Sequence, residues 1–192
     1  MLLLTVCPGC GTSGAAPCAD CVALMEPAQP VGEVADLDRC AALLDYDGPA
    51  REVVAQVKYR NVRGVLGWLG EGVAGLLSPG EVEVVTWAPT TDVRRRRRGF
   101  DHAELLASRV ASELHLPLAS LLVRAPGAPQ TGRSSAERLT GPTFWPRQAV
   151  TGRRVAVVDD VVTTGATFSA AARALRAAGA GYVVGVACAH PR

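Results

Sequence analysis

One stretch near the carboxyl end of this 192-residue chain limits the fold more than any other feature. Residues 154–159 form a β-branched apolar run typical of a buried strand. Residues 167–178 repeat apolar positions at helical spacing and stop before Gly179, a residue type that commonly ends helices. A strand that leads directly into a helix is the building unit of α/β domains with parallel strands.

The same alternation of strands and helices runs through the chain from residue 39 onward. We predict strands at 40–46, 82–88, 118–123 and 182–189, and helices at 50–60, 65–77 and 101–114, the last with Asp101 as its N-cap. Residues 124–149 show no apolar repeat and are predicted to be a long functional loop. The pattern predicts a central, mostly parallel sheet flanked by helices, with ligands bound in the loops after Trp87 and Val158.

Residues 1–37 differ in character from the rest. They are rich in Cys, Gly, Pro and Ala and show no helical or strand periodicity, so we predict a small cysteine segment with a linker, followed by an α/β domain over 38–192. The net charge of +2 does not demand a nucleic-acid partner. No apolar run approaches the roughly 18 residues of a membrane helix, and the short apolar start lacks a basic flank. We therefore expect a cytoplasmic protein without membrane insertion.

The end of the strand at 154–159 carries chemistry as well as structure. Two carboxylates, Asp159 and Asp160, are followed by a turn that opens the next helix: Thr163, Thr164, Gly165, Ala166 and Thr167. Backbone N–H groups at a helix start hold anions, and glycine lets the backbone approach a ligand closely. An ordinary helix cap needs fewer of these groups. The motif predicts a ribose 5-phosphate site, with the acids on the ring hydroxyls and the turn on the phosphate.

The cysteines near the start are arranged as a metal site. Two C-x2-C pairs contain Cys7, Cys10, Cys18 and Cys21, and two such turns offer four sulfurs to one tetrahedral ion. Thiolates select zinc or iron, with zinc preferred here, and disulfides are disfavoured in a cytoplasmic chain. A redox pair would need a thioredoxin-like helix start, which is absent. We predict a structural, zinc-ribbon-like segment, and expect Cys40 and Cys188 to be small buried hydrophobes.

An arginine run occupies residues 94–98. It is compatible with three interpretations: contact with nucleic-acid phosphates, binding of a diphosphate, or a solvated basic loop. Arg97 and Arg98, beside Gly99 and Phe100, are the members that we expect to bind a ligand. The histidines at 102, 115 and 190 show no metal or catalytic spacing, so no role is predicted for them.

The acidic T-T-G segment resembles the signature of the type I phosphoribosyltransferases, and nearly the whole chain resembles the ComF family. Four parts match that family in order: the cysteine cluster, Lys58-Tyr59, Arg97-Arg98-Gly99-Phe100 and the acidic motif. Two positions depart from its pattern. Asp101 stands where the family has asparagine, and Gly141 stands where an asparagine is expected after Arg138, although Gln130, Arg138 and Phe144 fit.

The resemblance implies a five-stranded parallel phosphoribosyltransferase core. It implies that Asp159 and Asp160 face the ribose hydroxyls of phosphoribosyl diphosphate and that residues 163–167 hold its 5-phosphate. Pro89, Thr90 and Thr91 would form the diphosphate loop, and part of 124–149 would close over the site. Mg²⁺ would bridge the diphosphate and ribose oxygens.

Two classes of function follow from the resemblance and stay open. The first is a transferase of the glycosyltransferase class, which displaces pyrophosphate from phosphoribosyl diphosphate in favour of an acceptor that the sequence does not identify. The second is a non-catalytic role in competence and DNA uptake, with single-stranded DNA and a helicase-like competence protein as partners. A fold alone does not choose between them.

Overall fold

The computed structural model describes residues 5–60, 63–91, 93, 95–96, 99–125 and 141–192. The centre of the predicted closing loop, with Gln130 and Arg138, lies outside these residues, as do the side chains of Lys58 and Tyr59. Within the described part of the chain, no helix has both the length and the apolar character needed to span a membrane.

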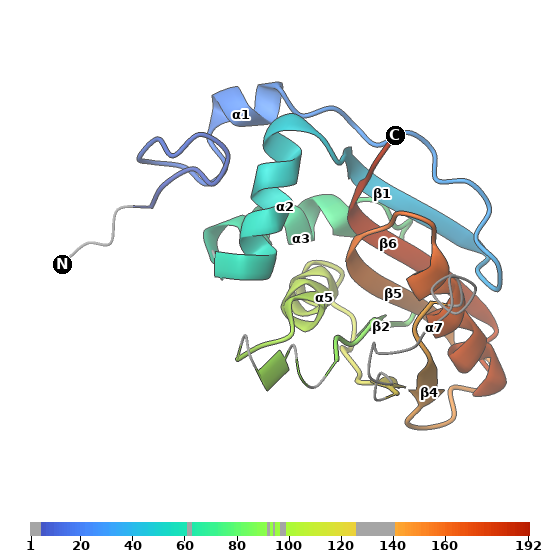
Figure 1. The fold of residues 1–192 in the computed structure, drawn as a ribbon. Helices are drawn as coiled ribbons and strands as arrows, with labels where there is room; N and C mark the ends of the chain where they lie inside the picture. Colours follow the sequence, from blue (N-terminus) through green and yellow to red (C-terminus); the bar gives the residue numbers. More distant parts are fainter. Residues whose placement is uncertain (1–4, 61–62, 92, 94, 97–98, 126–140) are drawn as a thin grey trace, which may run out of the picture.

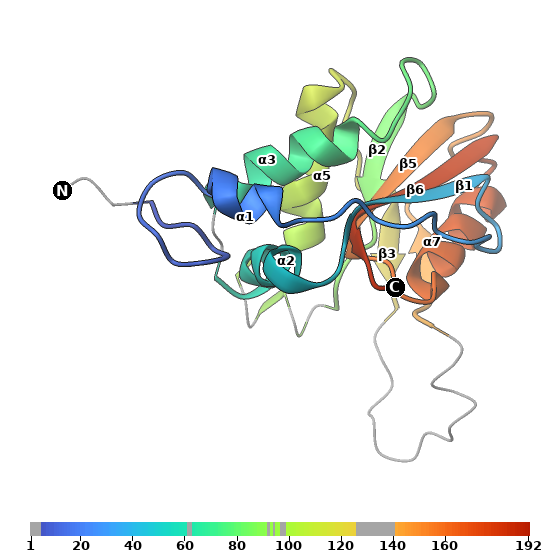
Figure 2. The ribbon, with the colours of Figure 1, turned by 90° about the horizontal axis from the view of Figure 1, so that it is seen from above.

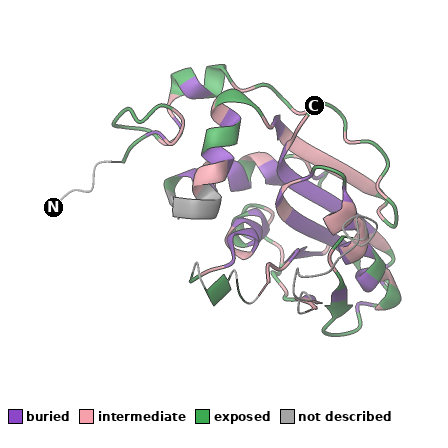
Figure 3. Ribbon diagram, in the orientation of Figure 1, coloured by how far each residue is buried: buried purple, intermediate pink, exposed green. Residues whose placement is uncertain are grey.

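A parallel sheet forms the centre of the molecule (Figure 1). Its strands are β1 (Arg39–Asp45), β2 (Val84–Trp87), β5 (Arg154–Val161) and β6 (Tyr182–His190), arranged in the order β1-β6-β5-β2 with parallel pairing throughout. The central strands are buried along most of their length (Figure 3). This burial explains their continuous apolar sequences, because a sheet covered on both faces needs apolar residues at successive positions.

Helices cover the two faces unequally (Figure 2). The helices α2 (Gly48–Arg60), α3 (Arg63–Ala74) and α5 (His102–Glu113) pack on one face, where Ala156 and Val158 of β5 point. The helix α7 (Ala166–Ala177) packs on the other face against Val155 and Val157, together with a two-stranded antiparallel hairpin of β3 (Leu122–Arg124) and β4 (Phe144–Pro146). Alternate residues of β5 therefore point to different layers of the core.

The segment before β1 lies against the sheet. Asp45 N donates to Glu26 O at 2.9 Å and Ala28 N donates to Leu43 O at 3.1 Å, so this stretch runs along the outer edge of β1. Residues 31–38, which we call the strap, then cross to α7, and their apolar side chains pack in the core on that face. Asp38 N donates to Val183 O at 2.9 Å, which ties the end of the strap to β6.

Most predicted elements are confirmed with boundary shifts of a few residues, including Asp101 as the N-cap of α5. The implied five-stranded core is wrong for the described residues, where the parallel sheet has four strands. Leu118 forms only an isolated parallel bridge with Val85, because the chain turns away and residues 122–124 pair instead with β4. The predicted loop over 124–149 consequently contains the strand β4.

Candidate functional site

The two acids lie at the carboxyl end of β5, in different surroundings. Asp160 is 6% exposed and lies on the side of Val158 that faces α5, whereas Asp159 is half-buried. Asp160 N donates to Asp159 Oδ1 at 2.8 Å. Oxygen atoms of the two carboxylates lie within 4.8 Å of each other, so a single ligand can contact both.

The predicted phosphate turn follows directly. Val162 N donates to Ala189 O at 2.9 Å, which holds the turn against the end of β6. Gly165 is the N-cap of α7 with φ +73°, a left-handed conformation that favours glycine. Ala166 N donates to Thr164 Oγ1 at 3.4 Å. A hollow of about 40 Å³ lies here, lined by Asp159 and the turn residues Val161, Val162, Thr163, Thr164, Gly165, Ala166, Thr167 and Phe168.

The loop after β2 leaves the sheet beside these acids. Trp87 is paired with Val158 in the parallel register, and Ala88 N donates to Val158 O at 3.1 Å. The residues that follow, Pro89, Thr90 and Thr91, therefore begin next to Asp159 at the same edge of the sheet. The structure thus brings together the two loops that were predicted to carry the site.

The start of α5 connects the two loops. Asp101 Oδ2 accepts a hydrogen bond from Thr90 N at 2.8 Å, and its Oδ1 accepts one from Ala103 N at 3.1 Å. His102 Nε2 lies 2.8 Å from Asp160 Oδ2, and both side chains are less than a tenth exposed, at 9% and 8%. Asp101 therefore fastens the β2 loop, and its neighbour contacts the buried acid of β5.

The sequence predicted no role for the histidines, and the structure places two of them beside the candidate site. His102 contacts Asp160, and His190 Nδ1 lies 2.8 Å from Val162 O at the base of the phosphate turn. Both contacts join residues far apart in the chain, so spacing did not reveal them. The available signal was position: a histidine directly after a helix N-cap, in a helix that follows a ligand loop.

The arginine run is only partly described by the structure. Arg94, Arg97 and Arg98 lie outside the described residues. Arg95 and Arg96 are exposed in a helical turn that begins where Arg95 N donates to Thr91 O at 2.9 Å. A neighbouring hollow of about 180 Å³ is lined by Thr90 and Asp101, together with three arginines: Arg95, Arg124 and Arg147.

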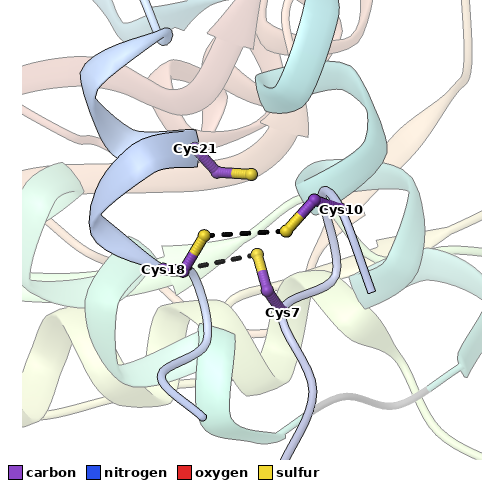
Figure 4. Close-up of side chains that lie close together, drawn as sticks. All are labelled: Cys7, Cys10, Cys18 and Cys21. Carbon is purple, nitrogen blue, oxygen red and sulfur yellow. Dashed lines mark hydrogen bonds between the residues drawn. The ribbon is translucent and has the colours of Figure 1, made fainter. Parts of the chain in front are cut away.

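The four predicted metal ligands gather at the opposite end of the molecule, beside α2 (Figures 1 and 4). Their Sγ atoms all lie within 4.8 Å of one another, and those of Cys10 and Cys18 are 3.7 Å apart. A tetrahedral site with metal–sulfur bonds of about 2.3 Å has S–S edges of about 3.8 Å. All six cysteines of the chain are free thiols. The cluster therefore has the donor set and the spacing of a four-sulfur metal site.

The local backbone builds this cluster from a tight turn and a short helix. Cys7 N donates to Thr12 O at 2.7 Å and Gly11 N donates to Cys7 O at 2.8 Å, which closes the first turn. Cys18 is the N-cap of α1 (Ala19–Ala23), which carries Cys21. A side chain at Gly9 would come within 2.9 Å of Cys21 Sγ.

The thiols differ in their readiness to ionise. Burial raises the pKa of Cys7, but backbone N–H groups of Cys18, Cys10 and Gly9 outweigh it and lower the pKa to about 6. Burial raises the pKa of Cys21, and the neighbouring sulfurs raise it further. One thiolate therefore forms readily, whereas a second beside it is disfavoured without a cation between them.

Comparison with known proteins agrees with these features. Residues 101–192 match the phosphoribosyl transferase domain family. The DNA utilization protein YhgH of Escherichia coli (strain K12) is 29% identical over 196 residues, which cover 93% of this chain and 81% of the relative. The competence protein ComFC of Bacillus subtilis (strain 168) is 26% identical over 177 residues, which cover 88% of this chain and 71% of the relative. The chain is thus similar to YhgH and ComFC over most of its length, and its carboxyl-terminal part matches the phosphoribosyl transferase domain family.

The comparison with solved structures gives weaker similarities. The glutamine phosphoribosylpyrophosphate amidotransferase from B. subtilis is 25% identical with a TM-score of 0.47, and the match covers 69% of this chain but only 30% of the enzyme. Adenine phosphoribosyltransferase from Leishmania donovani is 18% identical with a TM-score of 0.41, covering 87% of this chain and 65% of the enzyme.

Proposed function

We propose that this protein belongs to the ComF family and binds phosphoribosyl diphosphate, or a related sugar phosphate, at the edge of the sheet where β2 and β5 end. The observation that carries the proposal is the parallel pairing of Trp87 with Val158. It sets the acids of β5 and the turn into α7 beside the loop that follows β2. Carboxylates for hydroxyl groups and a helix start for phosphate then lie on one face of a shared site.

Each part of the ligand has assigned residues in this proposal. Asp159 and Asp160 accept hydrogen bonds from the ribose hydroxyls, and residues 163–167 surround the 5-phosphate. Residues 89–91 contact the diphosphate. Arg97 and Arg98 add positive charge there, an assignment that rests on the sequence because both lie outside the described residues.

Magnesium fits the oxygen-rich side of this site. Mg²⁺ prefers oxygen ligands and keeps several waters, so one or two carboxylates plus ligand phosphates satisfy it. Asp159 and Asp160 provide such oxygens within 4.8 Å of each other. When bound, the ion would neutralise charge on the diphosphate.

The first version of this function is a phosphoribosyltransferase. An acceptor nucleophile bonds to the anomeric carbon while the bond to the diphosphate oxygen breaks, and pyrophosphate leaves with the electron pair. The protein contributes by fixing the two phosphate ends and the ribose acids relative to the acceptor.

The second version is a non-catalytic module that handles single-stranded DNA together with a competence helicase. The names of the relatives, DNA utilization protein and competence protein, are compatible with it, as is the arginine run. We place the protein in the cytoplasm under both versions, because free C-x2-C thiols persist in a reducing compartment.

Calorimetric titration with phosphoribosyl diphosphate and Mg²⁺ tests the shared part of the proposal. Asp159→Asn with Asp160→Asn should abolish binding, while Glu113→Gln, on the exposed end of α5, should leave it unchanged. Binding by the double variant at the original affinity would contradict the assignment. A screen for pyrophosphate release over bases and nucleic acids then separates transferase from module.

We also propose that the sulfur cluster holds structural zinc. Of the two predicted units, 1–37 and 38–192, the first then has two parts: a cysteine segment stabilised by the metal, and residues 26–37, which pair with β1 and pack in the core of the second unit. The cysteine segment has few buried apolar residues, so metal binding would supply its folding energy. Metal analysis of protein purified under reducing conditions should give about one zinc per chain. If iron is found in place of zinc, the metal site is correct and only the identity of the ion changes. If neither metal is found, the proposed metal site is wrong.

A further inference from the structure

The start of α5 holds both halves of the proposed sugar-phosphate site through two consecutive residues. Asp101 accepts a hydrogen bond from Thr90 N, in the loop after β2. His102 lies 2.8 Å from Asp160, at the end of β5. Because Asp101 and His102 are neighbours in one helical turn, the spacing between the β2 loop and Asp160 is fixed through a rigid element.

Asp160 needs a partner of this kind because it is buried. Asp160 is 6% exposed. Two earlier residues on the same side of β5 belong to the apolar core, namely Ala156 and Val158. A carboxylate in such surroundings is costly unless it is paired with a donor or a cation. The imidazole of His102, itself 8% exposed, comes from the layer that faces Asp160, and its Nε2 atom lies 2.8 Å from Asp160 Oδ2.

We propose that His102 is a positioning residue that holds the Asp160 carboxylate in the orientation required by the ribose hydroxyls. Together with Asp101, it sets the distance between the acids and the diphosphate loop. This inference rests on the proposed function. It differs from a metal-ligand role, although the ligand atoms of His102, Asp159 and Asp160 lie within 4.8 Å of one another. Mg²⁺ selects oxygen, whereas an imidazole ligand would select a transition metal.

The first experiment titrates the full-length protein with phosphoribosyl diphosphate and Mg²⁺. His102→Phe keeps a planar ring without a donor, and we expect binding to weaken roughly 10- to 100-fold. His102→Gln keeps an N–H donor, and we expect an affinity within about threefold of the original. His115→Asn is the control, because His115 is exposed just beyond the same helix and has φ +55°, which asparagine tolerates.

The pattern across these variants decides the point. Rescue by glutamine supports a hydrogen-bonding, positioning role. Full affinity in His102→Phe, or equal losses in both variants, would overturn it. Titration with Mn²⁺ alone gives a further check. Binding of Mn²⁺ by the original protein that disappears in both variants would make His102 a metal ligand instead.

A second experiment needs no sugar phosphate and so separates failure of this inference from failure of the proposed function. Urea unfolding is measured for His102→Phe, Asp160→Asn and the double variant. We expect His102→Phe to shift the unfolding equilibrium constant roughly tenfold in the original background and less than twofold beside Asp160→Asn. Additive effects would show that His102 does not act through Asp160. Coupling without any ligand binding would instead refute the proposed function alone.

Discussion

Val34 lies directly against Gly165, so the strap covers the N-cap residue of α7. A Cβ atom at Gly165 would come within 2.7 Å of Val34 Cγ2. The strap is fastened along α7 as well, since Arg173 Nε and Asp36 Oδ2 are 3.3 Å apart and Arg176 pairs with Asp38. The segment before the sheet thus forms one wall of the turn that we assign to phosphate.

Replacement of this glycine tests the wall and the turn together. Gly165→Ala introduces a side chain at φ +73° and a clash with Val34, so we expect a loss of about 1–3 kcal/mol in unfolding free energy and weaker sugar-phosphate binding. Adding Val34→Ala should restore only the part due to the clash. Urea unfolding and calorimetry of the single and double variants measure both parts. Full recovery in the double variant would show that the left-handed backbone carries no cost.

Metal removal should affect the two ends of the chain differently. We expect a chelator to expose residues 5–25 to protease while the melting temperature of the sheet domain changes little, because the cysteine segment lies beside α2 and away from β5 and α7 (Figure 1). Limited proteolysis with mass spectrometry reports the cleavage sites. Cys10→Ser should reproduce this effect.

Cys40→Ser is the control for Cys10→Ser, because it removes a thiol outside the cluster and should leave residues 5–25 protected from protease. The Cys40 thiol of the unsubstituted protein gives a second control. Cys40 lies in β1, where burial raises the pKa of its thiol to about 11, so it should stay unreactive toward iodoacetamide at pH 8 with or without chelator. Alkylation of Cys40 at the same rate as the exposed Cys10 would contradict the half-buried position of Cys40 and the raised pKa of its thiol.

Low pH should weaken a hydrogen-bonded group at the amino end of the sheet, formed by Arg39, Glu81 and Tyr182. We call this group the clamp. Arg39 donates to both oxygens of Glu81 at 2.9 and 3.1 Å, and Tyr182 Oη donates to Oε1 at 3.0 Å. Burial raises the pKa of Glu81, but hydrogen bonds from Arg39, Ser78 N and Tyr182 outweigh it and leave the pKa below its ordinary value. A lowered pKa contributes stability above the unfolded value of about 4.3, and this contribution is lost as the pH falls further.

Glu81→Gln should therefore cost about 1 kcal/mol at pH 7 and much less near pH 3. Unfolding free energies at the two pH values measure the difference. Glu83→Gln is the control, because Glu83 is 42% exposed and its Oε1 atom lies 3.7 Å from Arg154 Nη2. An equal cost of Glu81→Gln at both pH values would show that the clamp does not titrate.

The arginine run distinguishes the two functional versions. Replacing residues 94–98 with alanine should lower single-stranded DNA affinity and flatten its salt dependence, by roughly one unit of slope for each arginine–phosphate pair that the substitutions remove. Fluorescence anisotropy at several salt concentrations measures this slope. If the unsubstituted protein does not bind DNA at low salt, the DNA-handling version is wrong. Unchanged sugar-phosphate affinity in the same variant would remove Arg97 and Arg98 from the diphosphate site.

Periodicity and turn chemistry predicted the parts of this fold that depend on local sequence. The apolar run before Asp159 and the helix that ends near Gly179 were placed correctly, and Asp101 caps α5 as expected. The strand expected at 118–123 was placed less well, because pairing of residues 122–124 with β4 depends on residues that lie much later in the chain.

In the candidate site, too, the features that depend on local sequence were predicted, and those that depend on contacts between distant residues were not. The acids and the phosphate turn were visible in sequence because they are contiguous. The contact between His102 and Asp160 and the position of Val34 over Gly165 depend on the tertiary fold, and no spacing rule connects these residues.

The strap also changes where this protein can be shortened. The apolar side chains of residues 31–38 pack in the same core as Cys40 and Ala42 of β1. In a chain that started at residue 38, Cys40 and Ala42 would lose this cover and face water. The outer edge of β1 would also lose its hydrogen bond with Ala28. Such a fragment should be prone to edge-to-edge aggregation, and the smallest soluble version should begin at or before residue 26.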